Sequence, residues 1–498
     1  MSIPTFAIIS WNKLKAVLLF LVISTVILTD GLATIYPVMG LVACAILIVG
    51  IAIAIRVAIR PDLATLLVVF LLYSNIPVIA VNFHGVPFVV GAAYIGLLGI
   101  PLVSYLIVRS EKIIIPPAMP FILMFFAVQI LGAFWVGADT LPALITFVLE
   151  GIVVYVLITN TVRSLSLLRS VIWALLLAGV VMSITPIYQQ ITKTYSNNYG
   201  GFGQTNEEGF ETGETDSQGT GRQLRLAGTI GEQNRFAQVL VMLIPLGLFR
   251  FFGEGSKTLR FLAVGATAII GLGIILTFSR GAAVSLLGLL FIMVWKRQIR
   301  PSYLFGTLAL SFVLLLATPG FMTRMEKLAD VSALFSAETR SSKDVDGAVR
   351  GRATAMLAAA MVFLDNPIIG VGPGRFPYYV QEYGNALNIR QLKENRRAHS
   401  MFLEIAAENG ALGLIAFIGA IYITLRNLSL TYKLHRCDRP ELANMAMCFW
   451  FVIVAYLLTA LFLHLSYIRY YWLMMGLAAS VTYIGTTIRR NEAFENSV

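Results

Sequence analysis

The chain has 498 residues, of which 58% are hydrophobic and only 13% are charged, and its mean hydropathy is +0.80. This composition excludes a water-soluble domain built around one core and predicts a polytopic membrane protein. We expect a lipid bilayer, and no nucleic acid, among its partners. The three cysteines, Cys44, Cys437 and Cys448, have neither the spacing of a metal site nor that of a disulfide framework.

About fourteen stretches approach the ~20 apolar residues that a membrane-crossing helix requires. The first, Val17 to Leu28, follows two lysines and has no small-residue cleavage site after it, so we expect a retained span. The expected spans are 14–29, 33–55, 63–81, 87–108, 117–136, 142–159, 170–191, 236–252, 259–278, 281–295, 303–319, 400–425, 444–463 and 468–487.

These spans divide the chain into five parts. We expect N-terminal helices, an outer polar loop, central helices, a large outer loop with an amphipathic helix, and C-terminal helices, at 1–191, 192–235, 236–319, 320–399 and 400–498. The predicted fold class is an all-α polytopic membrane protein of about 12–14 transmembrane helices with two long outer-face loops and a short surface helix.

Short basic turns between the spans predict the topology, because cytoplasmic loops collect Lys and Arg. They all fall on one side if every span crosses, so both termini are expected in the cytoplasm and both long polar segments on the outer face. The acidic, Gly/Ser/Thr-rich part of the first segment, Glu207 to Asp216, is predicted to be flexible loop.

Many arginines nevertheless fall on the outer face. Long loops cross a membrane whatever their charge, which is one interpretation; the other is an anion site, because the guanidinium group pairs bidentately with phosphate. Their positions favour the anion site for Arg222 and Arg225, which lead into "LAGTIGEQNRFAQVL". The same holds for Arg280, which lies between two apolar runs in "LTFSRGAAVSLL". A charge at such a depth indicates function, unless it belongs to a helix-end arginine that reaches the interface.

The second outer segment contains "VRGRATAMLAAAMVFLDNPIIGVGPGRF", which begins with Arg350 and Arg352. Its apolar residues have helical spacing over a stretch too short to cross the membrane, so we expect a helix on the outer surface. The following "GVGPGRF", Gly370 to Phe376, allows close backbone approach to an anion, although such sequences are commonly plain turns.

One of only four histidines opens the late apolar stretch "RRAHSMFLEIAAENGALGLIAF". His399 is preceded by Arg396 and Arg397 and followed by Glu404. Histidine titrates near neutral pH, so His399 is a candidate proton acceptor, whereas the alternative is an exposed residue at a helix start without a role. Gly410 and Gly413 have the small-residue spacing that allows close helix contact.

These residues resemble the bacterial O-antigen ligase and polysaccharide polymerase superfamily. The ligase signature is a histidine, then Asn, Ser or Gln, nine residues, Gly, two residues, and Gly, Thr or Tyr; here His399, Ser400, Gly410 and Gly413 match it completely. "LAGTIGEQNRFAQVL", "TFSRGA", "RGRATAM" and "DNPIIGVGPGRF" are similar to the family's successive blocks. The resemblance covers roughly 220–420, and the expected span count exceeds the family's usual number of about twelve.

The resemblance implies a GT-C-like bundle and a metal-independent glycosyltransferase without cofactors, in the bacterial inner membrane with its active site facing the periplasm. The donor would be an undecaprenyl-diphosphate-linked glycan. The acceptor would be lipid A–core for a ligase or a growing polysaccharide for a polymerase. His399 and Arg280 are the expected catalytic residues. The expected diphosphate- or substrate-binding residues are Arg222, Arg225, Arg352, Arg375, Arg396, Arg397, Glu232 and Glu404.

Other classes of protein fit part of the pattern. A transporter or flippase of lipid-linked sugars would also have many helices and interior arginines, but its polar groups should lie at mid-depth and in paired repeats. The polar groups here gather on one side, which favours an enzyme over a transporter and over a plain membrane scaffold. Ligase and polymerase remain equally open.

Overall fold

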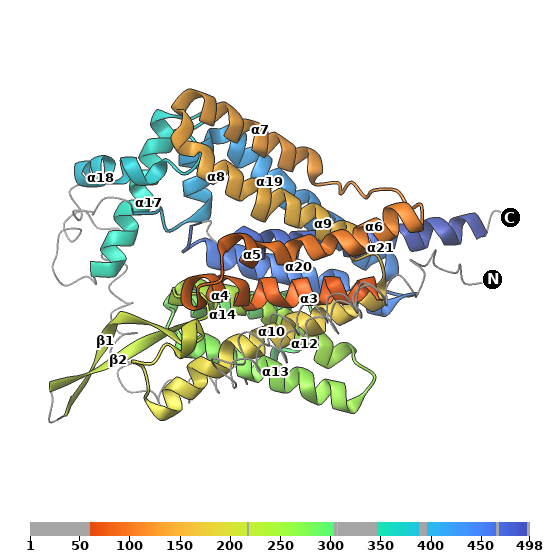
Figure 1. Ribbon diagram of the computed structural model, residues 1–498, viewed down its shortest axis with the longest axis horizontal. Coiled ribbons are helices and arrows are strands. Elements are labelled where there is room, and N and C mark those ends of the chain that lie inside the picture. Colours follow the sequence, from red (N-terminus) through yellow and green to blue (C-terminus); the bar gives the residue numbers. More distant parts are fainter. Residues whose placement is uncertain are drawn as a thin grey trace, which may run out of the picture.

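The computed structural model describes residues 60–216, 219–302, 306, 347–387, 396–464 and 468–495. They form a bundle of helices (Figure 1). A β-hairpin, Gln204–Asp216 (β1) and Gly219–Gly228 (β2), lies at one end of the bundle together with Gly347–Asp365 (α17) and Phe376–Ala386 (α18). The C-terminal turns of Ile468–Glu495 (α21) lie at the opposite end.

The helices before the hairpin follow the apolar stretches of the sequence. Pro61–Ser74 (α3) and Ile76–His84 (α4) are bent by 57° at Asn75, which has a positive φ. The remaining elements before the hairpin are Phe88–Ala93 (α5), Tyr94–Leu98 (η1), Gly99–Val103 (α6), Ser104–Val108 (η2), Met119–Val136 (α7), Ala138–Thr140 (η3), Leu141–Thr146 (α8), Phe147–Val153 (η4), Val154–Thr161 (α9), Leu165–Thr192 (α10) and Tyr199–Gly201 (η5).

Six further helices of the bundle lie after the hairpin in the described part of the chain. They are Gln233–Val241 (α11), Leu243–Gly253 (α12), Lys257–Leu276 (α13), Arg280–Trp295 (α14), Met401–His435 (α19) and Pro440–Ala460 (α20).

Eight helical segments of the described residues are long and apolar enough to cross a membrane, or nine if the bent pair α3–α4 forms one span. The prediction of an all-α polytopic membrane protein is therefore confirmed. The expected spans at 14–29 and 33–55, and 303–319 apart from residue 306, lie outside the described residues. Those at 281–295 and 468–487 are the helices α14 and α21, which are respectively shorter and more polar than the other spans.

The stretch expected to be flexible loop instead contains the antiparallel pair β1–β2. Thr205 pairs with Leu226 and Asp216 with Gly219, with register shifts between them. The prediction from composition was wrong here, because a polar stretch can pair as backbone strands without the apolar alternation that marks a buried strand. The hairpin leads directly into α11.

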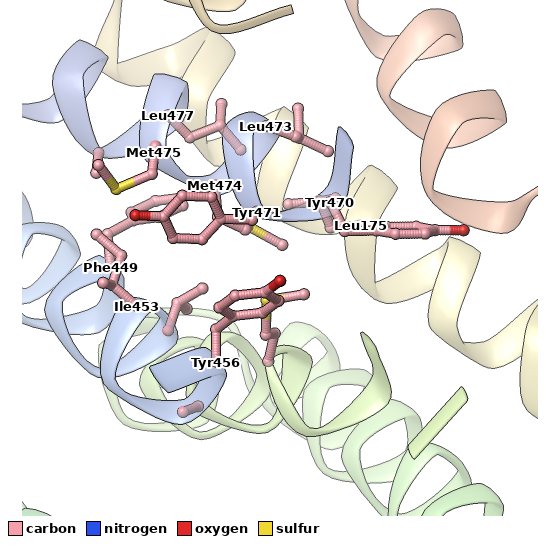
Figure 2. Close-up of a cluster of buried hydrophobic side chains, with 14 of the residues drawn as sticks. Leu175, Phe449, Ile453, Tyr456, Tyr470, Tyr471, Leu473, Met474, Met475 and Leu477 are labelled. Carbon is pink, nitrogen blue, oxygen red and sulfur yellow. The ribbon is translucent and has the colours of Figure 1, made fainter. Parts of the chain in front are cut away.

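Helix α21 lies inside the bundle and packs against α9, α19, α20 and η4. Figure 2 shows the centre of this packing, where Tyr471 of α21 faces Tyr456 of α20 with their rings 4.9 Å apart. Trp472 makes edge contacts with Phe147 and Tyr155. Because protein encloses α21 on all sides, it can carry more hydroxyl-bearing aromatic residues than a lipid-facing helix.

Helix α19 is broken at Gly410, whose φ of 62° and ψ of −166° are not helical. The turn after α17 fills the break: the N–H groups of Val371 and Gly372 donate to the carbonyls of Ala407 and Glu408 at 2.9 Å. The N–H of Ala411 donates to the carbonyl of Pro367 at 2.7 Å. The "GVGPGRF" glycines thus form the predicted turn, but their close approach is to the backbone of α19.

We predict that Gly410→Ala destabilises the protein by about 2 kcal/mol or more, because this backbone conformation suits only glycine and an added Cβ would lie 2.2 Å from the carbonyl of Ile368. The measurement is thermal unfolding in lipid nanodiscs. Gly271→Ala in α13 is the matched control, because its Cβ would meet nothing within 4 Å. Equal unfolding temperatures for the two variants would contradict the role given to this break.

Candidate active site

The predicted site residue Arg280 lies where α13 and α14 meet. Phe278 has a positive φ of 49°, and Ser279 caps α14, because its Oγ accepts a hydrogen bond from the backbone N–H of Ala282. Arg280 is therefore the first residue of α14. At this end of a helix the free backbone N–H groups and the helix dipole favour an anion.

Asn234, at the start of α11, connects this turn to the hairpin. Its Oδ1 accepts hydrogen bonds from Ser279 Oγ at 2.9 Å and from Arg225 Nη2 at 3.1 Å. Arg225 Nε also donates to the carbonyl of Thr277 at 3.1 Å. Glu232 caps α11 and accepts from the side-chain amide of Asn234 at 2.9 Å. The structure therefore brings Arg225 beside the Arg280 turn and gives Glu232 the position of a helix cap.

A small cavity of about 10 Å³ connects this turn to the outer helix α17. Arg352 of α17 reaches the cavity, and so do Ser279 and Gly281, the two neighbours of Arg280. The full lining is Asn234, Ser279, Gly281, Ala282, Arg352, Thr459, Phe462 and Leu463. Residues from four separate regions of the sequence thus meet at one end of the bundle.

His399 lies directly before α19 in a left-handed conformation, with φ of 52°. Burial, followed by the positive charges of Arg352, Arg396 and Arg235, lowers the pKa of His399 from 6.5 to about 4. At neutral pH the imidazole is therefore uncharged and can accept a proton. Its positive surroundings also place it beside any anion that these arginines hold.

Glu404 fixes the segment that carries His399. Its carboxylate accepts from Arg397 Nε at 3.1 and 3.2 Å and from the backbone N–H of Ala398 at 3.0 Å. Glu404 is only 2% exposed. Because a buried carboxylate with these partners is strongly held, it is a positioning residue for the histidine, and Arg397 is part of the same clamp.

Sequence reasoning did not select two residues that the structure places here. Arg235 of α11 is 3% exposed, and its Nη1 donates to Gln238 at 3.1 Å. His464 follows α20, and its ring lies edge-on to that of His399 with centroids 6.3 Å apart. Burial and then the charges of Arg235 and Arg397 hold the pKa of His464 well below its usual range. Both are polar residues beside apolar runs, the signal that had selected Arg280.

The remaining predicted residues are less central. Arg375 pairs with Asp139 at 3.1 Å and stacks on Tyr378, outside the lining of the small cavity. Arg396 is close enough to influence His399. Arg222 lies on β2 opposite Glu211, and only its backbone is described.

Within the described ranges, no three or more His, Cys, Asp or Glu side chains are grouped so that they could hold a metal ion. Buried charges occur at both ends of the bundle. At the end opposite the hairpin, Arg250 and Glu254 are four residues apart in sequence and pair with each other at 2.7 Å. The site end instead contains several cations from different helices.

The fold and this arrangement define a polytopic membrane protein with a cation-rich, histidine-containing site at one end of its bundle. Residues 265–418 match the family model described as O-antigen ligase, which confirms membership of the O-antigen ligase and polysaccharide polymerase superfamily for that segment. The family implies a membrane glycosyltransferase of ligase or polymerase type. No curated protein matches the chain.

We expect Glu404→Gln to loosen the histidine segment and to lower the free energy of unfolding by about 2 kcal/mol, because it leaves Arg397 without its buried counter-charge. Hydrogen exchange of the backbone amides at 396–400 measures the loosening, and thermal unfolding measures the change in stability. Glu441→Gln, which removes an exposed ion pair with Arg169, is the control and should cost less than about 1 kcal/mol. Unchanged exchange at 396–400 would show that the segment is held by other contacts.

The pKa of His399 gives a second prediction. Arg352→Gln should raise it from about 4 toward, but not to, 6.5, because burial remains. In the wild type, the folded state favours neutral His399, because its pKa is lower there than in the unfolded chain. The resulting contribution to the free energy of unfolding is fully present above pH 6.5 and is lost as the pH falls toward 4. Titration of ¹³C-labelled histidine, assigned with His399→Gln, measures the pKa. A value near 6.5 in wild type would overturn the electrostatic description.

Proposed function

We propose that the protein transfers a glycan from an undecaprenyl-diphosphate-linked donor to an acceptor hydroxyl. The observation that supports this most is the position of a neutral His399 among Arg235, Arg352 and Arg396. Arg352 also lines the small cavity together with Ser279 and Gly281, the two neighbours of Arg280. A general base beside clustered cations suits a reaction that needs proton removal and expels a diphosphate.

The reaction proposed is a single displacement. The acceptor oxygen attacks the anomeric carbon, the bond from that carbon to the diphosphate oxygen breaks, and its electron pair leaves with the lipid diphosphate. His399 accepts the proton of the acceptor hydroxyl. Arg280 and Arg352 hold the diphosphate and stabilise the negative charge that develops on it, with Arg225 as a further contact and Arg222 on the hairpin beside it. No metal is needed in this scheme.

The small cavity has about the volume of one water molecule. A diphosphate is larger, so donor binding requires Arg352, and with it the start of α17, to move away from Ser279. Arg352 comes from the outer segment between α14 and α19 and not from a membrane span, which suits such a movement. In this proposal Arg396 guides the anionic donor, and Arg375 contributes to the outer surface.

The proposed location is the bacterial inner membrane, with the site facing the periplasm and both termini in the cytoplasm. Support comes from the basic turns of the sequence, because Lys and Arg collect on the cytoplasmic side. Lipid A–core, for a ligase, and a growing polysaccharide, for a polymerase, are both acceptors that would be presented at this face.

The test is a reconstituted assay with a lipid-diphosphate-linked repeat unit, with and without lipid A–core. We expect product on lipid A–core from a ligase and a ladder from the donor alone from a polymerase. His399→Ala and Arg280→Ala should each lower turnover by roughly 10²–10³-fold. Arg426→Ala, in the part of α19 remote from His399, is the control and should retain activity.

Two results would reject the proposal. One is wild-type protein that releases no lipid diphosphate with either acceptor. The other is normal turnover by both variants. Movement of the lipid-linked sugar across vesicles would then be the activity to measure.

A further inference from the structure

A larger cavity, of about 520 Å³, lies on the other side of the histidine segment. It is enclosed by α7, by α8 with η4, by the first turns of α19, and by the turn at Pro373 and Gly374. Its lining is Phe125, Gln129, Pro142, Ala143, Thr146, Phe147, Pro373, Gly374, Arg397, Glu404, Ile405, Glu408, Asn409 and Ile468. Neither Arg280 nor Arg352 belongs to this lining.

Two amide side chains in this lining have buried oxygens that need a hydrogen-bond donor. Gln129 of α7 is 8% exposed and Asn409 of α19 is 3% exposed. Within the described part of the chain, Gln129 Oε1 and Asn409 Oδ1 are buried and have no hydrogen-bond partner. A buried acceptor without a donor costs free energy, so these two oxygens would gain from a ligand that donates hydrogen bonds when their amide groups turn toward the cavity.

The charge of the cavity points the same way. Glu404 and Glu408 contribute two carboxylates and Arg397 one guanidinium group. Arg397 is already engaged by Glu404, and Glu408 accepts from the backbone N–H of Phe376 at 3.2 Å. The surroundings are therefore rich in acceptors, and the one guanidinium group of the lining is already paired, in contrast to the small cavity on the Arg280 side. A carboxylate or phosphate would meet these acceptors without an unpaired cation in the lining to bind it.

The walls supply apolar contact. Phe125 and Phe147 line the cavity with rings 5.3 Å apart in an edge-to-face arrangement, and Ile405 and Ile468 lie beside them. A sugar ring combines apolar C–H faces with outward hydroxyl donors, which suits walls of this kind. A hydrocarbon chain would leave both amide oxygens without a donor.

We propose that this cavity binds a pyranose ring of the glycan substrate, one that carries hydroxyl or amino groups and no acidic group. Its hydroxyl or amino N–H and O–H groups donate to Gln129 Oε1, Asn409 Oδ1 and Glu408. This rests on the proposed transfer reaction and adds a sugar preference to it. The ring can belong to the acceptor or to the first sugars of the donor, because both present the same chemistry.

The cavity is coupled to the reaction through the clamp described above. Arg397 and Glu404 line it and flank His399 in sequence, and Glu404 accepts from both the Arg397 side chain and the backbone N–H of Ala398. A sugar that fills the cavity contacts the clamp and therefore lies next to the segment that presents the base. Binding there positions the glycan without touching the diphosphate side.

The first test measures binding without turnover. Saturation-transfer NMR on wild-type protein in nanodiscs would use tetramers of glucosamine, N-acetylglucosamine and galacturonic acid as probes. We expect binding of the first two and at least roughly tenfold weaker binding of the acidic tetramer. Gln129→Leu and Asn409→Leu should each weaken the binding about five- to tenfold. Equal binding of all three probes, or unchanged binding by both variants, would overturn the proposal.

The second test identifies the source of the sugar. In the reconstituted assay, both variants should raise KM about five- to tenfold with little change in kcat. A rise in the acceptor's KM assigns the ring to the acceptor, and a rise in the donor's KM assigns it to the donor. Unchanged values for both would reject the site. Gln298→Leu and Asn427→Leu, outside the cavity lining, are matched controls.

The two proposals fail differently. His399→Ala should lose turnover but bind the tetramers as wild type does. If no lipid diphosphate is released by any protein while the tetramers bind selectively and the leucine variants bind them more weakly, the sugar site stands and the transfer reaction falls. If turnover is normal and tetramer binding is unselective, the transfer reaction stands and the sugar site falls.

Discussion

The break in α19 is the constraint on which the site end of this protein depends. A membrane helix interrupted in its second and third turns leaves carbonyl and N–H groups without partners, which is unfavourable in a bilayer. Here the turn after α17 supplies those partners, through Val371 and Gly372 on one side of Gly410 and Pro367 on the other. The outer segment is thereby fixed to the membrane bundle by backbone hydrogen bonds, and these do not depend on side-chain identity except at the glycines.

Two sites with different linings follow from this contact between the turn and α19. The turn fixes the end of α17 against α19, and Arg352 near the start of the same helix reaches the Ser279 region. Because the same turn runs past Glu408, its Pro373 and Gly374 close the larger cavity. The histidine segment lies between the cation-lined and the acceptor-lined regions, held by Glu404. An anion bound beside Arg352 would offset the positive charges that lower the pKa of His399, so donor binding would make this residue a stronger base.

The sequence predicted the elements that depend on local pattern. The spans within the described residues, the existence of helix α17, the glycine turn and the position of Arg280 between two helices follow from hydropathy and spacing over short windows. His399 was predicted for a different reason, because it matches the histidine of the ligase signature. The hairpin was missed because its residues are polar on both faces and give no burial signal.

What could not be predicted depends on long-range contacts. His464 lies beside His399 only because α20 returns to the site end of the bundle, and Gln129 and Asn409 reach one cavity only because α7 packs against α19. Arg397 was expected to meet substrate, yet it is engaged by a carboxylate seven residues along the same chain, a spacing that only the extended segment before α19 makes possible. A cation near a helix start is therefore ambiguous in sequence: Arg280 and Arg397 look alike there. They differ in the structure. Arg280 is the first residue of the helix that Ser279 caps, whereas Arg397 has the carboxylate of Glu404 within reach.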